Sequence, residues 1–385
     1  MRIQFDTGPH ARASHSASIT QMAHGTVFDA PSSIIRAQCF EDVPQAFQEI
    51  AQAKAQGAWV AGYMSYDLGM CLDPALHSLA RRNAVARDDL PLLEFGVYDA
   101  PKAVNAASNV GNVQTVLTPA WTPARYRDAF DQVKSYIEAG DCYQVNLTFR
   151  VDVHSAAGPR QLYDALCARQ PVPYGVLIET DHHTFLSRSP ELFFETDAKG
   201  HITVRPMKGT VARADEARRD AQAKAWLAAS EKDQAENLMI VDLLRNDLSR
   251  ISAVGSVKVP YLFDIETYKT VHQMTSTVTA QLMPDTDFYT LCKALFPCGS
   301  ITGAPKIRAM EIIDELEDGE RGAYCGAMGW IAPDGTSEFN VAIRTLVFEA
   351  GSHTGHLHVG GGLVYDSTAD SEYNEALLKA EFARL

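Results

Sequence analysis

Strand-forming segments follow one another in pairs along the middle of the chain, and this order constrains the fold most. Alternating apolar and polar residues predict a strand at 145–153 and two hairpin-like pairs, at 175–179 with 184–187 and at 192–195 with 201–205. Helical segments lie between some of these pairs, but helices and strands do not alternate regularly. This irregular order favours the α+β class with largely antiparallel sheets over parallel βαβ units.

Helical signals flank these strands. Thr122 and Pro123 suit the N-cap and first position of a helix that Gly140 would end, and a longer helical region is predicted over 215–250 with a break near Ser230. The remaining predictions are helices at 43–56, 159–169, 287–295, 305–317 and 370–385, and strands at 59–64, 92–98, 257–262, 271–282, 327–331, 340–349 and 357–365.

The chain divides by composition into three predicted parts. Residues 1–25 are polar and show no period, so they are expected to form a loose extension. Residues 26–112 are predicted to form a small N-terminal subdomain, and residues 120–385 the main body. The Ala-, Asn-, Val- and Thr-rich segment at 101–120 is predicted to be a linker between them.

Charge and composition narrow the function classes. The formal net charge is −14 and no long basic run is present, which argues against a nucleic-acid binder. No apolar run approaches the ~20 residues that span a bilayer, and the first residues lack an apolar leader, so neither a membrane segment nor a signal peptide is expected. The seven cysteines are scattered without a C-x-x-C pair, which suits reduced thiols in the cytoplasm. Any anion site in so acidic a chain must be local.

One lysine stands in an unusual place. In H-I-T-V-R-P-M-K-G-T-V at 201–211, Ile202 and Val204 alternate with polar residues, Pro206 is expected to end strand pairing, and Gly209 permits a close approach of backbone to a ligand. Lys208 lies between the proline and the glycine. It is either a solvated lysine in a turn or a functional amine at the end of a strand.

Two pairs of carboxylates have helical spacing. Asp233 and Glu236 are three residues apart at the start of a helix that is predicted to be buried, and Glu372 and Glu375 are three apart with Lys379 one turn beyond. Carboxylates without nearby cysteine or histidine suit a hard cation such as Mg²⁺. Local salt bridges in the first helix and favourable charge at the N-terminus of the second remain alternatives.

Two glycine-rich stretches complete the candidates. Gly360, Gly361 and Gly362 follow a strand and leave backbone N–H groups open to a carboxylate, although a bulge would explain them too. The stretch P-C-G-S-I-T-G-A-P-K at 297–306 lacks the G-K-[ST] ending of a nucleotide-binding loop. It could instead offer the hydroxyl of Ser300 or Thr302 to a ligand.

These pieces, in this order, resemble the chorismate-utilising enzymes: anthranilate synthase component I, aminodeoxychorismate synthase component I, and the isochorismate and salicylate synthases. The resemblance covers about 120–385 and is carried by S-P-E-L-F, P-M-K-G-T, E-N-L-M-I-V-D-L-L-R-N-D-L, P-C-G-S-I-T-G-A-P-K, Y-C-G-A-M-G-W, F-N-V-A-I-R-T and G-G-G-L-V-Y-D-S. It implies an α+β fold of two orthogonally packed antiparallel sheets, flanked by helices, with the site in a central cleft.

The resemblance also implies a set of site residues. Mg²⁺ would be held by Glu236 and Glu375, with Asp233 and Glu372 close by, and would grip the ring carboxylate of chorismate. The implied substrate-binding residues are Gly360, Gly361 and Gly362 for the ring carboxylate, Arg344, Tyr324 and Ser300 for the pyruvyl carboxylate, His272 near the ring, and Lys379 near the metal.

Two positions distinguish the members of this family. Gln144 stands where isochorismate and salicylate synthases use a lysine to activate water, and Lys208 stands where anthranilate synthases read P-I-A-G-T. The resemblance therefore implies an aminodeoxychorismate synthase, which converts chorismate and ammonia to 4-amino-4-deoxychorismate on the route to 4-aminobenzoate and folate. Lys208 would be the nucleophile and Glu191, in S-P-E-L-F, the acid.

The partner and the alternatives follow from the same resemblance. No Cys/His/Glu glutaminase pattern is evident, so a separate glutamine amidotransferase subunit is expected to supply the ammonia. No lyase domain is expected, and no tryptophan-binding signature is found in the short N-terminal part. Anthranilate synthase component I remains an alternative, as does a non-catalytic partner of an amidotransferase.

Overall fold

The strands form two large antiparallel sheets. The computed structural model describes residues 1–10, 24–83, 90–105, 113–268 and 271–385, and within these ranges each sheet has ten strands. The order of sheet A is β16 (Gly303–Ala304), β8 (Gln144–Ser155), β20 (Thr354–Leu363), β19 (Thr345–Glu349), β10 (His183–Ser189), β9 (Tyr174–Glu179), β1 (Arg2–Phe5), β2 (His24–Phe28) and β6 (Lys102–Asn105), with β7 (Thr115–Pro119) beside β8. The order of sheet B is β13 (Met207–Ala212), β15 (Val271–Gln281), β12 (His201–Val204), β11 (Leu192–Thr196), β18 (Ser337–Val341), β17 (Ala327–Ile331), β4 (Trp59–Met64), β5 (Leu93–Tyr98) and β3 (Ser33–Ala37), with β14 (Lys258–Thr267) beside β15.

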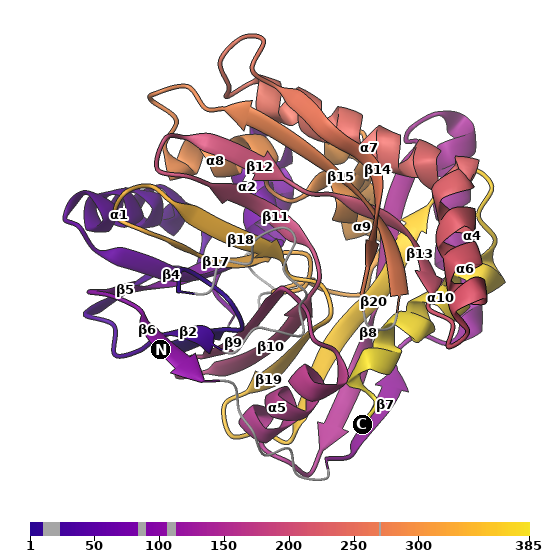
Figure 1. Ribbon diagram of the computed structural model, residues 1–385, viewed down its shortest axis with the longest axis horizontal. Helices are drawn as coiled ribbons and strands as arrows, with labels where there is room; N and C mark the ends of the chain where they lie inside the picture. Colours follow the sequence, from indigo (N-terminus) through magenta and orange to yellow (C-terminus); the bar gives the residue numbers. More distant parts are fainter. Residues whose placement is uncertain (11–23, 84–89, 106–112, 269–270) are drawn as a thin grey trace.

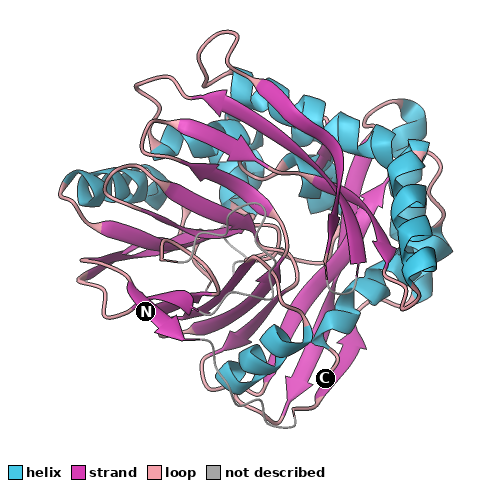
Figure 2. Ribbon diagram, viewed as in Figure 1, coloured by secondary structure: helices cyan, strands magenta, loops and turns pink. Residues whose placement is uncertain are grey.

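Helices lie around the outside of the two sheets (Figures 1 and 2). They are α1 (Val43–Ala55), α2 (Leu68–Leu72), α3 (His77–Asn83), α4 (Pro123–Ala139), α5 (Pro159–Arg169), α6 (Ala217–Ala229), α7 (Glu231–Ser249), α8 (Phe288–Leu295), α9 (Lys306–Leu316) and α10 (Ala369–Ala380). The predicted caps of α4 are confirmed, because the Thr122 side chain accepts a hydrogen bond from the backbone N–H of Arg125 and Gly140 has a φ of 82°. The predicted break at Ser230 separates α6 from α7. The α+β prediction is thus confirmed.

Apolar side chains fill the space between the sheets and the space under the helices. Between the sheets, Tyr63 of β4 meets Phe185 of β10 with ring centroids 4.6 Å apart. Outside sheet B, Phe47 of α1 packs on Phe288 of α8 at 5.7 Å. Outside sheet A, Phe149 of β8 packs against α4 and α10. Burial of each such ring contributes roughly 1.5–3 kcal/mol, so all three layers help to hold the sheets in place.

The N-terminal part is more deeply built into the fold than its sequence indicates. The extension predicted at 1–25 contains β1, which pairs with β9 and β2 in sheet A, and the first two residues of β2, so the prediction of a loose segment is wrong for residues 2–5 and 24–25. Four residues are too few for an alternating pattern to stand out. Residues 11–23 of that prediction lie outside the described residues.

The segment predicted as a small subdomain, 26–112, shares both sheets with the main body. In sheet B, β4 pairs with β17 of the C-terminal part, and in sheet A, β2 and β6 continue the sheet beyond β1. The linker predicted at 101–120 includes the strands β6 and β7. Both sheets therefore contain strands from each of the two predicted parts. The boundary between these parts marks a change in composition, and their division into a subdomain and a main body stays a prediction.

Two further boundaries differ from the sequence prediction. Strand pairing resumes at Met207, directly after Pro206, because the missing N–H of a proline removes only one hydrogen bond between the strands. The register of β13 with β15 then shifts between Met207 and Thr210. The strand predicted at 340–349 is two strands, β18 in sheet B and β19 in sheet A. Between them Arg344 has a φ of 51°, and there the chain passes from one sheet to the other.

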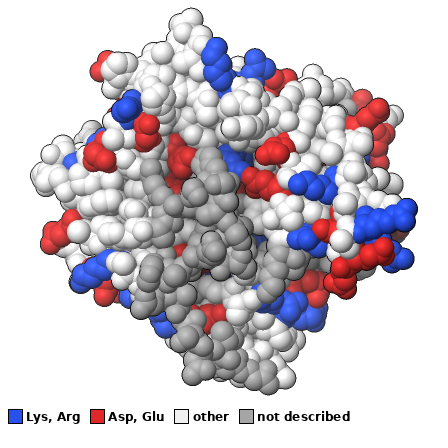
Figure 3. Space-filling model, in the orientation of Figure 1, with Lys and Arg blue, Asp and Glu red and all other residues white. Residues whose placement is uncertain are grey.

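The described surface carries both signs of charge. On the face in Figure 3, lysine and arginine side chains are interspersed with aspartate and glutamate. No helix within the described ranges combines the length and the apolar character that crossing a bilayer requires.

Candidate active site

Lys208 reaches from β13 of sheet B to the end of β20 in sheet A. Its Nζ lies 3.2 Å from the position that a Cβ on Gly362 would occupy, and the side-chain Nε2 of Gln144 lies 2.8 Å from the same point. The Gln144 side chain is fully buried, and neither its Nε2 nor its Oε1 has a hydrogen-bond partner among the described residues. The absence of a side chain at Gly362 therefore leaves room for an amine and an unpaired amide to lie side by side.

The surroundings of Lys208 favour its neutral form. Burial lowers the pKa of Lys208 from its ordinary value, and the nearby positive charge of Lys379 lowers it further. The carboxylates of Glu236, Glu191 and Glu375 oppose this shift, but they do not reverse it. A lysine with a lowered pKa presents more neutral amine at neutral pH, which is the form that can act as a nucleophile.

Glu191 is one of the three carboxylates that act electrostatically on this lysine. Its side chain is 3% exposed, and its Oε1 accepts a hydrogen bond of 2.8 Å from the Ser300 hydroxyl. Burial raises the pKa of Glu191 to about 7, against the opposing effects of Ser300, Lys208 and Arg344. A carboxyl group with this pKa is partly protonated near neutral pH and can donate a proton to a leaving group.

Glu191 and Arg344 lie on two neighbouring passages between the sheets. Glu191 follows β10, where the chain leaves sheet A for β11 of sheet B, and Arg344 lies where it returns from β18 to β19. The Ser189 hydroxyl donates to the Val341 carbonyl at 2.6 Å, and the Val341 N–H donates to the Glu191 carbonyl at 3.1 Å. These bonds place an acid and a guanidinium on adjacent segments.

Arg344 lines a small pocket. The other lining residues are Arg169, Gln170, Pro171, Val172, Pro190, Tyr268, Val271 and Gln273. Burial lowers the pKa of Arg344, while Tyr268 and Glu191 oppose the shift. A half-buried guanidinium in a small pocket is suited to pair with a carboxylate, which it can bind through two parallel hydrogen bonds.

The glycines of β20 meet α10 at a second group of charges. A Cβ on Gly361 would lie 3.1 Å from Glu372 Oε2 and 3.5 Å from Lys379 Nζ. The Lys379 amine donates to the Gly360 carbonyl at 2.9 Å and pairs with Glu375, also at 2.9 Å. The predicted set of glycines, Lys379 and two glutamates is therefore brought together.

The two glutamates of α10 differ in charge balance. Burial and repulsion from Glu375 raise the pKa of Glu372, although a 2.7 Å hydrogen bond from Ser367 opposes the rise. For Glu375, burial alone would raise the pKa, but the combined effects of Lys379, Lys232 and Lys208 outweigh it and the pKa is lowered. Lys232 of α7, which lies 3.8 Å from Glu236, acts on both glutamates, so the acidic ends of α7 and α10 face each other.

The donor atoms suit a hard cation that substrate and water would help to hold. All four predicted ligands offer carboxylate oxygens. Burial and Glu375 disfavour the charged form of Glu372, and a nearby cation would stabilise that form. Within the described ranges, no three His, Cys, Asp or Glu side chains lie close enough to hold an ion among themselves. Mg²⁺ typically takes one or two carboxylates and completes its shell with water and substrate oxygens, so this open arrangement fits it.

Two of the predicted site residues, Asp233 and His272, have other neighbours. Asp233 is held at the start of α7 by Ser230, and it packs under Gly209, where a Cβ would lie 2.8 Å from its Oδ1. The ring nitrogens of His272 are each 3.0 Å from a side chain: Nδ1 from Thr267 Oγ1 and Nε2 from Asp220 Oδ1 of α6. Both ring nitrogens of His272 are thus engaged by Thr267 and Asp220, and its predicted place near the ring of the substrate stays a prediction.

Tyr324 is buried and stacks on His358, with ring centroids 5.5 Å apart. Burial raises the pKa of Tyr324 well above its usual range, so it stays a neutral phenol.

The sequence analysis did not predict several residues that line the Arg344 pocket, namely the Gln170–Val172 loop, Tyr268 and Gln273. The sequence carries no local signal for them, because they meet only through the packing of α5 and β15 around Arg344.

Comparisons with known proteins agree with this architecture. The family model described as chorismate binding enzyme matches residues 4–384. The chain is 36% identical to aminodeoxychorismate synthase component 1 of Salmonella typhimurium, over 96% of this chain and 85% of the relative. It is 39% identical to anthranilate synthase component 1 of Pseudomonas aeruginosa, over 68% of this chain and 52% of the relative. The structure of anthranilate synthase component I from Streptococcus pneumoniae superposes with a TM-score of 0.79 at 23% identity, covering 98% and 95% of the two chains. The chain belongs to the family of chorismate-binding enzymes.

Proposed function

We propose that this chain is component 1 of an aminodeoxychorismate synthase, a transferase that converts chorismate and ammonia to 4-amino-4-deoxychorismate. The observation that carries the proposal is the convergence of Lys208, with its lowered pKa, and the buried acid Glu191. The aminodeoxychorismate synthase relative aligns over 96% of this chain and the anthranilate synthase relative over 68%, which supports this choice over the alternative.

The reaction divides into two displacements. The neutral amine of Lys208 attacks C2 of chorismate, both ring double bonds shift, and the C4 hydroxyl leaves as water with a proton from Glu191. The lysine nitrogen then returns a proton to Glu191. Ammonia attacks C4, both double bonds shift back, and the C2–N bond to Lys208 breaks as the lysine amine takes the proton that the incoming nitrogen loses. The net change replaces the C4 hydroxyl by an amino group and releases one water. The buried Gln144 amide is neutral and cannot activate water at C2 as a base.

Binding uses the two groups of charges at the ends of the site. Arg344, with Tyr324 and Ser300, would receive the pyruvyl carboxylate, and the amides of Gly360 to Gly362 would receive the ring carboxylate. Mg²⁺, held by Glu236 and Glu375 with Asp233 and Glu372 close by, would supply a positive charge for the ring carboxylate. Lys379 pairs with Glu375 and lies beside these glycines. His272 would lie near the ring of chorismate.

A separate glutamine amidotransferase subunit would supply the ammonia, and the product would serve the synthesis of 4-aminobenzoate and folate. The designation component 1 of the relatives supports a partner subunit. The seven cysteines are free, which agrees with the proposed cytoplasmic location.

The test is analysis of the products formed from chorismate, Mg²⁺ and ammonium. Chromatography with mass detection should show 4-amino-4-deoxychorismate. Formation of anthranilate with release of pyruvate would replace the proposal by its alternative, and failure to consume chorismate would exclude both enzymes.

A further inference from the structure

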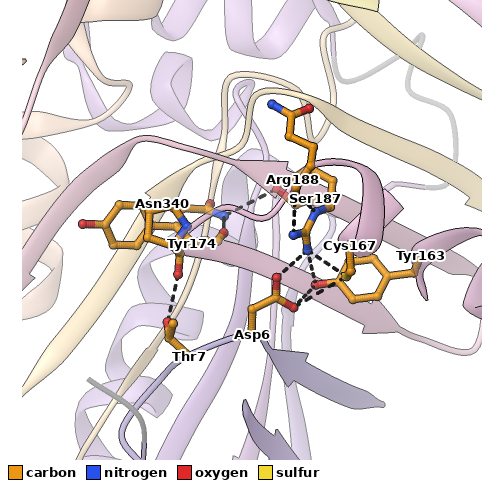
Figure 4. A network of polar contacts seen from close by, with 10 residues as sticks. Asp6, Thr7, Tyr163, Cys167, Tyr174, Ser187, Arg188 and Asn340 are labelled. Carbon is orange, nitrogen blue, oxygen red and sulfur yellow. Dashed lines mark hydrogen bonds and ion pairs between the residues drawn. The ribbon is translucent and has the colours of Figure 1, made fainter. Parts of the chain in front are cut away.

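A buried arginine outside the catalytic group ties three distant segments together. Arg188 of β10 is 1% exposed, and its Nη1 lies 2.5 Å from Asp6 Oδ2, beyond the end of β1 (Figure 4). Its Nη2 donates to the Gln170 carbonyl at 2.9 Å, just past α5. The Tyr163 hydroxyl, from α5, donates to Asp6 Oδ1 at 2.8 Å. Gly175 lies against this pair, where a Cβ would overlap both Asp6 and Arg188.

Arg188 also contacts the segments that carry Glu191, the proposed acid, and Arg344, the proposed binding residue for a carboxylate. The backbone N–H of Arg188 donates a hydrogen bond of 3.0 Å to the backbone carbonyl of Arg344, the residue with a φ of 51°. Arg188 also lies three residues before Glu191, and Gln170, whose carbonyl it holds, lines the Arg344 pocket. A shift of the Arg188 side chain would therefore be transmitted to both sides of the site.

We propose that the Asp6–Arg188 ion pair is a positioning element for this site: it fixes the two passages between the sheets so that Glu191 and Arg344 keep the separation that chorismate binding and turnover require. This inference rests on the proposed function. A buried ion pair adds little net stability relative to apolar residues of the same size, but its directed hydrogen bonds hold the joined segments at fixed distances. A misplacement of about 1 Å in such a site can lower the rate roughly 100-fold.

The main test replaces the pair by apolar residues. The double variant Asp6→Leu with Arg188→Met removes both charges together and so avoids leaving one of them buried and unpaired. The milder Arg188→Lys keeps the positive charge but cannot reach both Asp6 and Gln170 with a fork of donors. The control is Arg2→Gln. It removes the 3.2 Å ion pair between Glu179 and Arg2 of β1, the strand that precedes Asp6, and it leaves the Arg188 contacts intact.

The variants are assayed below their measured unfolding temperatures, with kcat and KM for chorismate determined at saturating ammonium and Mg²⁺. We expect both Arg188 variants to lose roughly 10- to 100-fold in kcat/KM, through a lower kcat where Glu191 is displaced and a higher KM where Arg344 is displaced. The control should stay within about twofold of the unmodified chain. If the double variant does not fold, Arg188→Lys alone decides. Folded Arg188 variants with unchanged kcat/KM would reduce the pair to a structural role and overturn the inference. Formation of a product other than aminodeoxychorismate by the unmodified chain would overturn only the proposed function, since the ratios can be measured on any product.

Discussion

Lys208 and Glu191 have pKa values that burial moves toward each other. Burial disfavours the charge on both side chains, so the pKa of Lys208 is lowered and that of Glu191 is raised to about 7. A proton can therefore pass between a lysine that must become neutral and an acid that must become protonated. The Ser300 hydroxyl holds Glu191 by donating a hydrogen bond to its Oε1.

Removal of the lysine should abolish covalent chemistry but not binding. We expect chorismate and Mg²⁺ without ammonia to give an adduct on Lys208, visible by intact mass and peptide mapping. Lys208→Ala should form no adduct and lose roughly a thousandfold or more in kcat, as removal of a nucleophile does elsewhere. Lys293→Ala, at an exposed position on α8, serves as the control. Synthesis of aminodeoxychorismate by Lys208→Ala at the unmodified rate would rule out the nucleophile.

Glu191 should impose a pH limit on adduct formation. Because burial raises its pKa from 4.5 to about 7, the protonated acid is present below about pH 7 and is lost above it. Below that pH, Glu191→Gln should form the adduct roughly 10²–10⁴-fold more slowly in a single turnover. The ratio of the unmodified rate to the Glu191→Gln rate should decline above that pH, because neutral Lys208 increases equally in both proteins. The folded state also binds this proton more tightly than the unfolded chain, so Glu191 should make stability fall between about pH 4.5 and 7. A glutamine variant with the unmodified pH profile would assign the acid elsewhere.

The strand β20 and the helix α10 together form the side of the site where we propose that Mg²⁺ binds. A Cβ on Gly361 would lie 3.1 Å from Glu372 Oε2 and 3.5 Å from Lys379 Nζ, and the space left by the missing side chain is where we propose that an ion or a carboxylate binds. Neighbouring Gly360 is pressed against β8, and its carbonyl binds Lys379. The three glycines thus serve different purposes: one for strand packing and two for space in the site.

We expect Gly361→Ala to fold but to need more Mg²⁺. Its Cβ would meet only the ends of flexible side chains, so Glu372 and Lys379 can shift by the few tenths of an ångström that are required. The Mg²⁺ concentration for half-maximal activity should rise roughly 10-fold or more. Gly158→Ala, where nothing lies within 4 Å of the new Cβ, is the matched control. An unchanged Mg²⁺ requirement in Gly361→Ala would place the ion outside this gap.

Elements with a clear local pattern could be predicted, and those defined by distant partners could not. The caps at Thr122 and Gly140 and the break at Ser230 are local, and the structure has them. The strand β13 and the passage at Arg344 depend on pairing with β15 and β19, which no local period records. Similarly, the motif resemblance predicted Lys208, Glu191 and the β20 glycines as residues of one site. It did not predict the contact between Arg188 and Asp6, because these two residues meet only through the pairing of β1 with β9.

The whole molecule should use ammonium by itself but glutamine only with a partner. No glutaminase motif is evident in the sequence, whereas Lys208, Glu191 and the α10 carboxylates converge within this one chain. The purified chain should therefore make aminodeoxychorismate from ammonium and Mg²⁺, and glutamine should replace ammonium only after an amidotransferase subunit is added. Glutamine-dependent turnover by the purified chain, with ammonia contamination excluded by a glutamine-free blank, would contradict the proposal.

The pairing of β4 with β17 has a consequence for synthesis on the ribosome. Met64 faces Ala327 in that pairing, so the first half of sheet B must wait for most of the chain to be translated. Until then the nascent polypeptide carries apolar strands with open edges, the condition in which chains aggregate or recruit chaperones. Slow translation before residue 327 would prolong this exposure, and ribosome-bound intermediates that stop short of β17 should remain sensitive to protease along β4 and β5.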